Sequence, residues 1–146
     1  MGSTSERRPG AGLMCFTRVS MTIADVGFLL YWTVTLFALI PAEYAYKDYA
    51  DPVISDWNYS FVLLDLAAGL TGPAALCLGR RTATGNAHPL MLISLVLTST
   101  AGLQAVAFWA LRGDFALEWW APNLFLLLFP LPAITVLVRR TALVGP

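Results

Sequence analysis

The sequence has few of the side chains that bind metals or form disulfides. Its 146 residues include two cysteines, Cys15 and Cys77, and one histidine, His88. The cysteines form no C-x-x-C motif, which argues against a thiol oxidoreductase, and we expect both thiols to stay reduced at the cytoplasmic face. With so few ligating side chains, we expect no metal site and no bound cofactor.

Charge is also scarce. Only 12% of the residues are charged and 58% are hydrophobic, whereas about a quarter of a soluble domain is charged. The apolar residues gather in four runs, at about 22–40, 59–79, 90–111 and 121–138. A hydrocarbon core of about 30 Å needs about 20 helical residues, so the sequence predicts an all-α, integral membrane four-helix antiparallel bundle.

The arginines that flank the runs fall on one side of this predicted membrane, and most acidic residues fall on the other. The arginines concerned are Arg7, Arg8, Arg18, Arg80, Arg81, Arg139 and Arg140. Short loops rich in Lys and Arg mark the cytoplasmic face, so we expect an N-in/C-in topology. The expected organisation is a disordered tail over 1–19, a transmembrane domain over 20–140 and a cytoplasmic tail over 141–146.

Prolines and polar residues predict where the first two spans begin and end. Proline lacks an N–H and stops a helix, so we expect the first span to end at Ile40–Pro41. A short interfacial helix over 44–49 is expected to end at Asp51–Pro52. Either Asn58 or Ser60 is expected to cap the second span by accepting from its free amides.

Three further prolines lie in the last run. Pro122 is expected to open the fourth span, where its missing N–H has no consequence. Pro130 and Pro132 are expected to kink this span and to leave carbonyls free near 126–128.

Asp65 lies inside the second apolar run. A carboxylate at membrane depth costs about 3 kcal/mol on insertion scales and normally faces a partner, water or a ligand. Asp65 shares a helical face with the small residues Ala68, Gly69 and Gly72, so it is expected to point into the bundle.

Polar and aromatic residues near the outer face predict a pocket around this acid. Gln104 reaches about the same depth as Asp65, so a hydrogen bond between the two is expected. The candidate ligand- or proton-binding residues are Asp65, Gln104, Asn58, Asn123, Trp109 and Trp119, a polar group set in an apolar wall. The alternative is that Asp65 is paired or protonated and only sets the helix register.

Asp25 gives a weaker signal. It is expected near the cytoplasmic headgroups, two turns from Arg18, in a structural role. Its depth differs from that of Asp65 too much for a carboxylate pair of the acid–base kind.

Several short motifs resemble the YvaD-like family of small bacterial four-helix membrane proteins of unknown function. The motifs are Asp25–Val26–Gly27–Phe28 with Tyr31–Trp32; Ile40–Pro41-x-Glu43–Tyr44; Lys47–Asp48–Tyr49-x-Asp51–Pro52; Trp57–Asn58-x-Ser60–Phe61 with Leu64–Asp65; Ala101–Gly102–Leu103–Gln104 with Phe108–Trp109; and Trp119–Trp120-x-Pro122–Asn123. The resemblance covers residues 20–130. It implies a bacterial plasma-membrane protein without an assigned activity, so it transfers no catalytic residue.

Three functions fit these features. The first is a non-enzymatic protein that binds a partner or a small apolar ligand at an outward-facing polar and aromatic pocket; the lack of a nucleophile–base set favours it. The second is a proton-coupled transporter that uses Asp65, and the third is an enzyme that acts on a lipid. The expected partners are the lipid bilayer and either a second copy or another membrane protein, with no nucleic acid.

Overall fold

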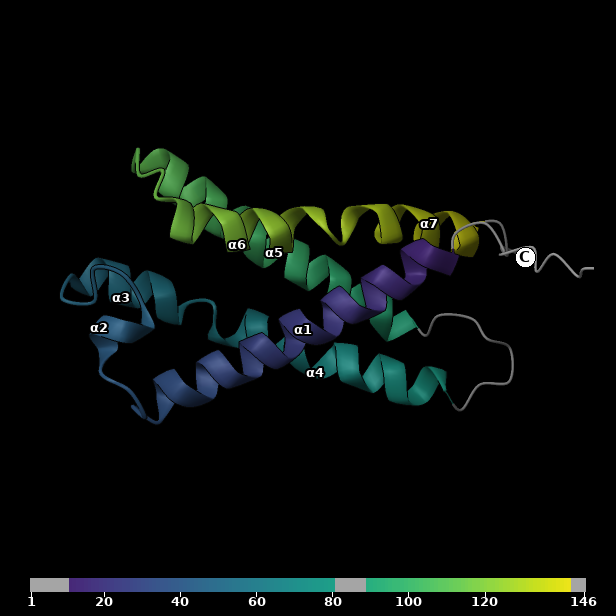
Figure 1. Cartoon of the computed structure of the whole chain (residues 1–146), viewed down its shortest axis with the longest axis horizontal. Helices are drawn as coiled ribbons and strands as arrows, with labels where there is room; N and C mark the ends of the chain where they lie inside the picture. Colours follow the sequence, from purple (N-terminus) through teal and green to yellow (C-terminus); the bar gives the residue numbers. More distant parts are fainter. Residues whose placement is uncertain (1–10, 81–88, 143–146) are drawn as a thin grey trace, which may run out of the picture.

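The computed structural model describes residues 11–80 and 89–142, and these residues form helices and their connections without a strand (Figure 1). The helices in these ranges are α1 (Ala11–Leu36), α2 (Ala42–Ala45), α3 (Pro52–Tyr59), α4 (Val62–Gly79), α5 (Pro89–Leu111), α6 (Leu117–Leu128) and α7 (Leu131–Ala142). Residues 1–10, 81–88 and 143–146, which include His88 and parts of the two predicted tails, lie outside the described chain.

Four segments of the described chain are helical, long and apolar enough to cross a membrane. Two are the single helices α1 and α5, and two are pairs of consecutive helices, α3 with α4 over Pro52–Gly79 and α6 with α7 over Leu117–Arg140. Successive segments run in opposite directions, so the start of α1 and the end of α7 lie at the same end of the molecule (Figure 1). The predicted all-α arrangement of four apolar segments is therefore confirmed.

The first helix starts earlier than predicted. α1 begins at Ala11, so residues 11–19 are helical rather than part of a disordered tail. Thr17 of this stretch is buried, and Met14 packs against the buried cluster that contains Met21. These tertiary contacts stabilise turns that composition alone assigns to a tail.

The end of α1 also differs from the prediction, because the helix stops at Leu36 and not at Ile40–Pro41. Ala38 adopts a left-handed φ of 49°. Its N–H donates to O of Thr35 at 3.2 Å, and the N–H of Leu39 donates to O of Val34 at 2.9 Å. This pair of bonds is the Schellman motif, which satisfies the last carbonyls and ends the helix before the proline is reached.

The connection between α1 and α4 holds two short helices in place of the one predicted over 44–49. α2 ends at Ala45, and Asp51–Pro52 begins α3 instead of ending a helix. The Asp51 side chain accepts from the N–H of Val53 at 2.9 Å, and Pro52 occupies the first turn, where its missing N–H needs no partner.

Neither Asn58 nor Ser60 caps the helix that follows. The Ser60 hydroxyl donates to O of Trp57 at 2.6 Å, and α4 follows Phe61 without a side-chain cap. Ser60 and Phe61 keep helix-like backbone angles, so α3 leads into α4 with its amides bonded to backbone carbonyls. The predicted cap is wrong because the second segment starts at Pro52, ahead of both residues.

Pro130 divides the last apolar segment into α6 and α7, which confirms the predicted kink. One carbonyl in the predicted region, O of Leu127, accepts from the Ser99 hydroxyl of α5 at 2.9 Å. Pro122 lies inside α6 rather than at its start, because the helix already begins at Leu117. Arg139 and Arg140 occupy the last turn of α7.

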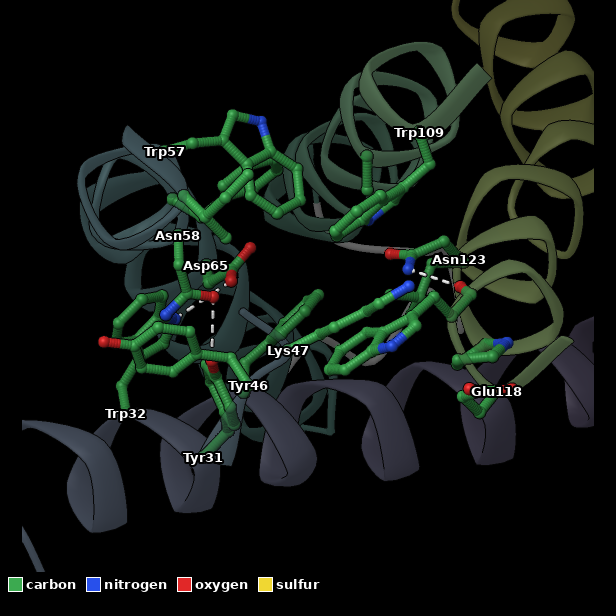
Figure 2. Close-up of a pocket in the computed structure, with 17 residues that line it drawn as sticks. Tyr31, Trp32, Tyr46, Lys47, Trp57, Asn58, Asp65, Trp109, Glu118 and Asn123 are labelled. Atoms are coloured by element: carbon green, nitrogen blue, oxygen red, sulfur yellow. Dashed lines mark hydrogen bonds between the residues drawn. The ribbon is translucent and has the colours of Figure 1, made fainter. Parts of the chain in front are cut away.

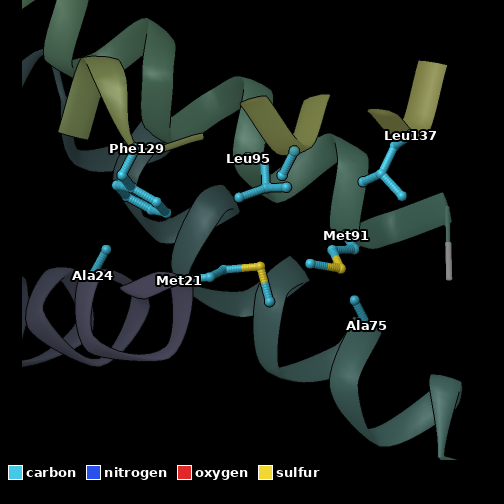
Figure 3. Packing of buried hydrophobic residues seen from close by; sticks show 8 residues of the cluster. Met21, Ala24, Ala75, Met91, Leu95, Phe129 and Leu137 are labelled. Atoms are coloured by element: carbon cyan, nitrogen blue, oxygen red, sulfur yellow. The ribbon is translucent and has the colours of Figure 1, made fainter. Parts of the chain in front are cut away.

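The helices pack in the order α1, α4, α5, α6, and α7 returns to contact α1. Near the start of α1 they enclose a cluster of buried residues from α1, α4, α5 and the last segment (Figure 3). Its members are Met21, Ala24, Ala75, Met91, Leu95, Phe129, Ala133 and Leu137. α1 and α6 make little direct contact, so the bundle is less tightly closed at the end where α1 finishes.

Gly102 allows α5 and α6 to approach each other. A Cβ at this position would lie 2.5 Å from the backbone nitrogen of Leu127 and 2.6 Å from O of Asn123. Both atoms belong to the backbone of α6, which cannot yield as a flexible side chain could. A glycine here is therefore a requirement of the α5–α6 packing.

We expect Gly102→Ala to lower the free energy of unfolding by about 1–3 kcal/mol, because overpacking forces the two backbones apart. Gly27→Ala is the matched control, since a Cβ at Gly27 meets nothing within 4 Å. Thermal unfolding in a mild detergent measures both. An equal melting temperature for the two variants would contradict the close α5–α6 approach.

Candidate ligand-binding site

A cavity of about 300 Å³ lies at the end of the bundle where α1 finishes and α6 begins (Figure 2). It exists because α1 and α6 contribute opposite walls without packing directly on each other. The lining residues are Phe28, Tyr31, Trp32, Tyr46, Lys47, Ile54, Trp57, Asn58, Phe61, Asp65, Ala105, Trp109, Glu118, Trp119, Pro122, Asn123 and Leu126. Most of this wall is aromatic or aliphatic, and a few polar groups interrupt it, as in small-ligand sites.

Asp65 is held by a tryptophan of α1. Nε1 of Trp32 donates to Oδ2 of Asp65 at 2.9 Å, and both side chains are buried, 1% and 6% exposed. The face that Asp65 shares with Ala68, Gly69 and Gly72 is buried as predicted. The second carboxyl oxygen, Oδ1, is also buried and has no hydrogen-bond partner in the described chain.

Asn58 connects α3 to α1 beside this acid. The Tyr31 hydroxyl donates to Oδ1 of Asn58 at 2.8 Å. The amide nitrogen Nδ2 of Asn58 is buried, and no partner for it occurs among the described residues. The cavity wall therefore contains a second buried polar atom without a hydrogen-bond partner in the described chain.

Trp109 is the centre of the aromatic wall. Its ring stacks on Trp119, with centroids 6.2 Å apart and planes at 27°, and meets Trp57 edge-on at 5.4 Å. Trp109 is 3% exposed, and its Nε1 is a third buried polar atom without a partner in the described ranges. Unpaired buried donors and acceptors are costly, so these three atoms are candidate contacts for a bound molecule.

Lys47 brings a positive charge to the mouth of the cavity. Its Nζ lies 5.4 Å from the centroid of the Trp109 ring and forms an ion pair with Asp114, which joins the connection after α2 to that between α5 and α6. The hydrogen bond from Lys47 holds the pKa of Asp114 below its usual value, and the same bond raises the pKa of Lys47. Lys47 is therefore charged and already balanced by Asp114.

Five of the six residues predicted to form the site line the cavity together: Asp65, Asn58, Asn123, Trp109 and Trp119. Asn123 also donates to O of Trp119 at 2.7 Å, within α6. The sixth prediction is wrong, because Gln104 is exposed on α5 and does not bond to Asp65. Counting residues from the helix end gave the height of Gln104 but not the direction in which it points.

Trp32 is the partner of Asp65 that sequence reasoning missed. Gln104 was selected by counting residues from the end of its helix. The same count places Trp32 at the depth of Asp65, because Trp32 lies near the end of α1. An indole N–H is a donor only, so a tryptophan at the depth of the buried acid was the available signal.

Asp25 is more deeply buried than predicted, with no exposed surface. Because α1 begins at Ala11, Asp25 lies in the body of the helix rather than near its start. Its Oδ2 occupies the space where a Cβ on Gly72 of α4 would stand. Ser94 of α5 lies 3.4 Å from Oδ1, a long hydrogen bond, and Oδ2 has no partner among the residues that the structure describes.

Residues 17–143 match a family model described as "Family of unknown function (DUF5360)". The chain belongs to the DUF5360 family. Over 127 residues it is 40% identical to "Uncharacterized protein YvaD" of Bacillus subtilis (strain 168), an alignment that covers 87% of this chain and 95% of that protein. No solved structure matches the chain.

The match to the DUF5360 family confirms the resemblance seen in the motifs. It extends from α1 into the last residues of the chain and so includes every segment that lines the cavity. Since the family has no assigned function, the geometry of the cavity is the basis for a proposal.

Two substitutions at Asp65 separate the contribution of its hydrogen bond to Trp32 from the contribution of its charge. Asp65→Asn keeps an acceptor for Trp32 Nε1, so we expect a change in unfolding free energy below about 1 kcal/mol. Asp65→Leu leaves the Trp32 N–H unpaired and is expected to cost about 1–3 kcal/mol.

Thermal unfolding in detergent, recorded across pH, measures both Asp65 variants against the unmodified chain. If Asp65→Asn is as unstable as Asp65→Leu at every pH, the bond to Trp32 is not what holds Asp65. A pH-dependent step of the unmodified chain that disappears in both variants identifies Asp65 as a titrating group.

Proposed function

We propose that this chain is a multi-pass protein of the bacterial plasma membrane that binds a small apolar ligand in the cavity at the outward end of its bundle. The observation that carries the proposal is the cavity itself, an enclosure of about 300 Å³ whose wall is largely aromatic and aliphatic. No nucleophile–base pair is needed for this function, and none is part of the proposal.

The outer surface of the bundle supports membrane insertion. Large apolar side chains are exposed on each long segment, among them Ile23 and Leu30 of α1, Leu63 and Leu70 of α4, Ile93 and Leu103 of α5, and Phe125 and Leu131 of the last segment. Leu63 is 82% exposed. Soluble monomers rarely expose so much contiguous apolar surface, whereas lipid would cover it.

The charges at the two ends support the N-in/C-in orientation. Arg80 follows α4, and Arg139 and Arg140 end α7, at the same end of the bundle as the start of α1. The opposite end has the acidic connections with Glu43 and Asp114. The rule that short basic loops stay inside then puts both termini in the cytoplasm and the cavity at the outer face.

The orientation is testable by labelling single cysteines in cells with a membrane-impermeant thiol reagent. In a background with Cys15 and Cys77 replaced by serine, we expect Tyr49→Cys to react from outside and Arg80→Cys to react only after permeabilisation. Labelling of Arg80→Cys in intact cells would reverse the proposed topology.

The binding function is testable with isobutylbenzene, an uncharged probe that suits an aromatic cavity. We expect the probe to raise the melting temperature of the purified protein in detergent and to change its tryptophan fluorescence, because four of its tryptophans line the cavity. At a probe concentration of 100 times Kd, the stabilisation would be about 2.7 kcal/mol.

Ala105→Leu should abolish the effect of isobutylbenzene by filling the cavity, since Ala105 lines it. Ala107→Leu is the matched control, because it makes the same change at an exposed position of α5 outside the lining. Equal responses in the two variants would show that the probe acts through the detergent, and the cavity would not be its site.

Proton-coupled transport through Asp65 is a second candidate, favoured by the placement of the two buried acids. Asp25 of α1 faces Gly72 of α4, and Asp65 of α4 faces Trp32 of α1. The antiparallel contact between α1 and α4 therefore contains two carboxyl groups at different depths of the bundle. This candidate requires Asp65→Asn, reconstituted in vesicles, to lose a pH-driven flux that the unmodified chain supports.

A further inference from the structure

We propose that the ligand of this cavity is an amphiphilic organic cation, an apolar body with a protonated amine that binds against Asp65. This inference rests on the proposed function, because the apolar body of the ligand occupies the same cavity, and it adds a charged amine to that ligand. It depends on the charges of the lining residues, on the Asp65 oxygen that has no partner among the described residues and on the tryptophan rings of the cavity wall.

The lining residues have an excess of acid. Asp65 and Glu118 contribute carboxyl groups and Lys47 contributes the only ammonium group in the lining. The charge of Lys47 is already matched by Asp114, with which it forms an ion pair. The carboxyl groups of Asp65 and Glu118 have no such partner among the described residues, so a cationic guest complements the cavity better than an anionic or neutral one.

The Asp65 side chain lines the cavity, and one of its two carboxyl oxygens has no partner among the described residues. Oδ2 accepts from Trp32, whereas Oδ1 is buried and has no partner in the described part of the chain. A protonated amine can donate an N–H to this oxygen and supply a counter-charge in the same contact. Charge-assisted hydrogen bonds of this kind are about twice as strong as neutral ones.

The aromatic side chains offer a second kind of contact to a cation. Ammonium groups are attracted to the faces of tryptophan rings within about 6 Å of the centroid. The protein already uses this attraction once, since Nζ of Lys47 lies 5.4 Å from the centroid of Trp109. Trp32, Trp57 and Trp119 line the same cavity, and they can surround the apolar body of the guest.

A pair of isosteric probes tests the inference. N,N-dimethylbenzylamine is protonated at neutral pH, and isobutylbenzene has the same shape with a C–H in place of the N–H. Binding of each is measured by tryptophan fluorescence in a neutral detergent. For the unmodified chain we expect the amine to bind at least about tenfold more tightly than isobutylbenzene, as a hydrogen bond to a charged group implies.

Variants identify the group that recognises the charge. Asp65→Asn should weaken amine binding about tenfold or more and leave isobutylbenzene binding unchanged. Glu118→Gln, at an exposed position of the lining, should weaken amine binding about twofold. Asp56→Asn is the matched control, because Asp56 is an exposed acid of α3 outside the lining, and it should change neither affinity.

The outcomes separate this inference from the function on which it rests. If isobutylbenzene binds and the amine binds no more tightly, the inference of a cationic ligand is overturned and the proposal of an apolar ligand site stands. If neither probe binds, both proposals fail. Equal amine affinity in the unmodified chain and Asp65→Asn also overturns the inference. If Asp65→Asn does not fold, the ratio of the two affinities in the unmodified chain decides the question.

Discussion

The close approach of α4 to α1 and α5 is the constraint on which the rest of the structure depends. The buried face of α4 consists of Ala68, Gly69, Gly72 and Ala75 together with Asp65. A Cβ on Gly72 would overlap the Asp25 carboxyl group, and one on Gly69 would lie 3.0 Å from the Asp25 carbonyl oxygen. Small residues let these backbones meet, and so bring both buried acids into one helix contact.

The cavity lies at the end of the bundle where this tight helix packing stops. Gly102 allows α6 to pack closely on α5, while side chains as large as Trp32 and Trp109 line the cavity that α1 and α6 border. The helices cannot close around rings of this size as they close around glycine. The same bundle therefore has a dense end around Met21 and Met91 and an end with room for a guest.

The candidate site combines polar groups, which need hydrogen-bond partners, with aromatic side chains, which do not. Asp65 and Trp32 satisfy each other in part, as do Asn58 and Tyr31, and all four side chains line a largely aromatic enclosure. The DUF5360 family has no assigned function, so the basis for the proposed ligand is the cavity and the polar side chains of its wall whose atoms have no partner in the described chain. Assembly with a second copy or another membrane protein stays a prediction.

The sequence by itself determined the four apolar segments, the break at Pro130 and the family, and five of the six residues predicted for the site line the cavity. These depend on segment length, on proline chemistry and on height along a helix, all of which are local. The tertiary structure alone decided that Trp32, and not Gln104, bonds to Asp65, and that Asp25 is buried on Gly72. In α4 and α5 apolar residues lie on every side of the helix, so hydrophobic periodicity gives little information on how these helices are rotated. That rotation is set by the contacts of small residues between helices, which exist only once the bundle has formed.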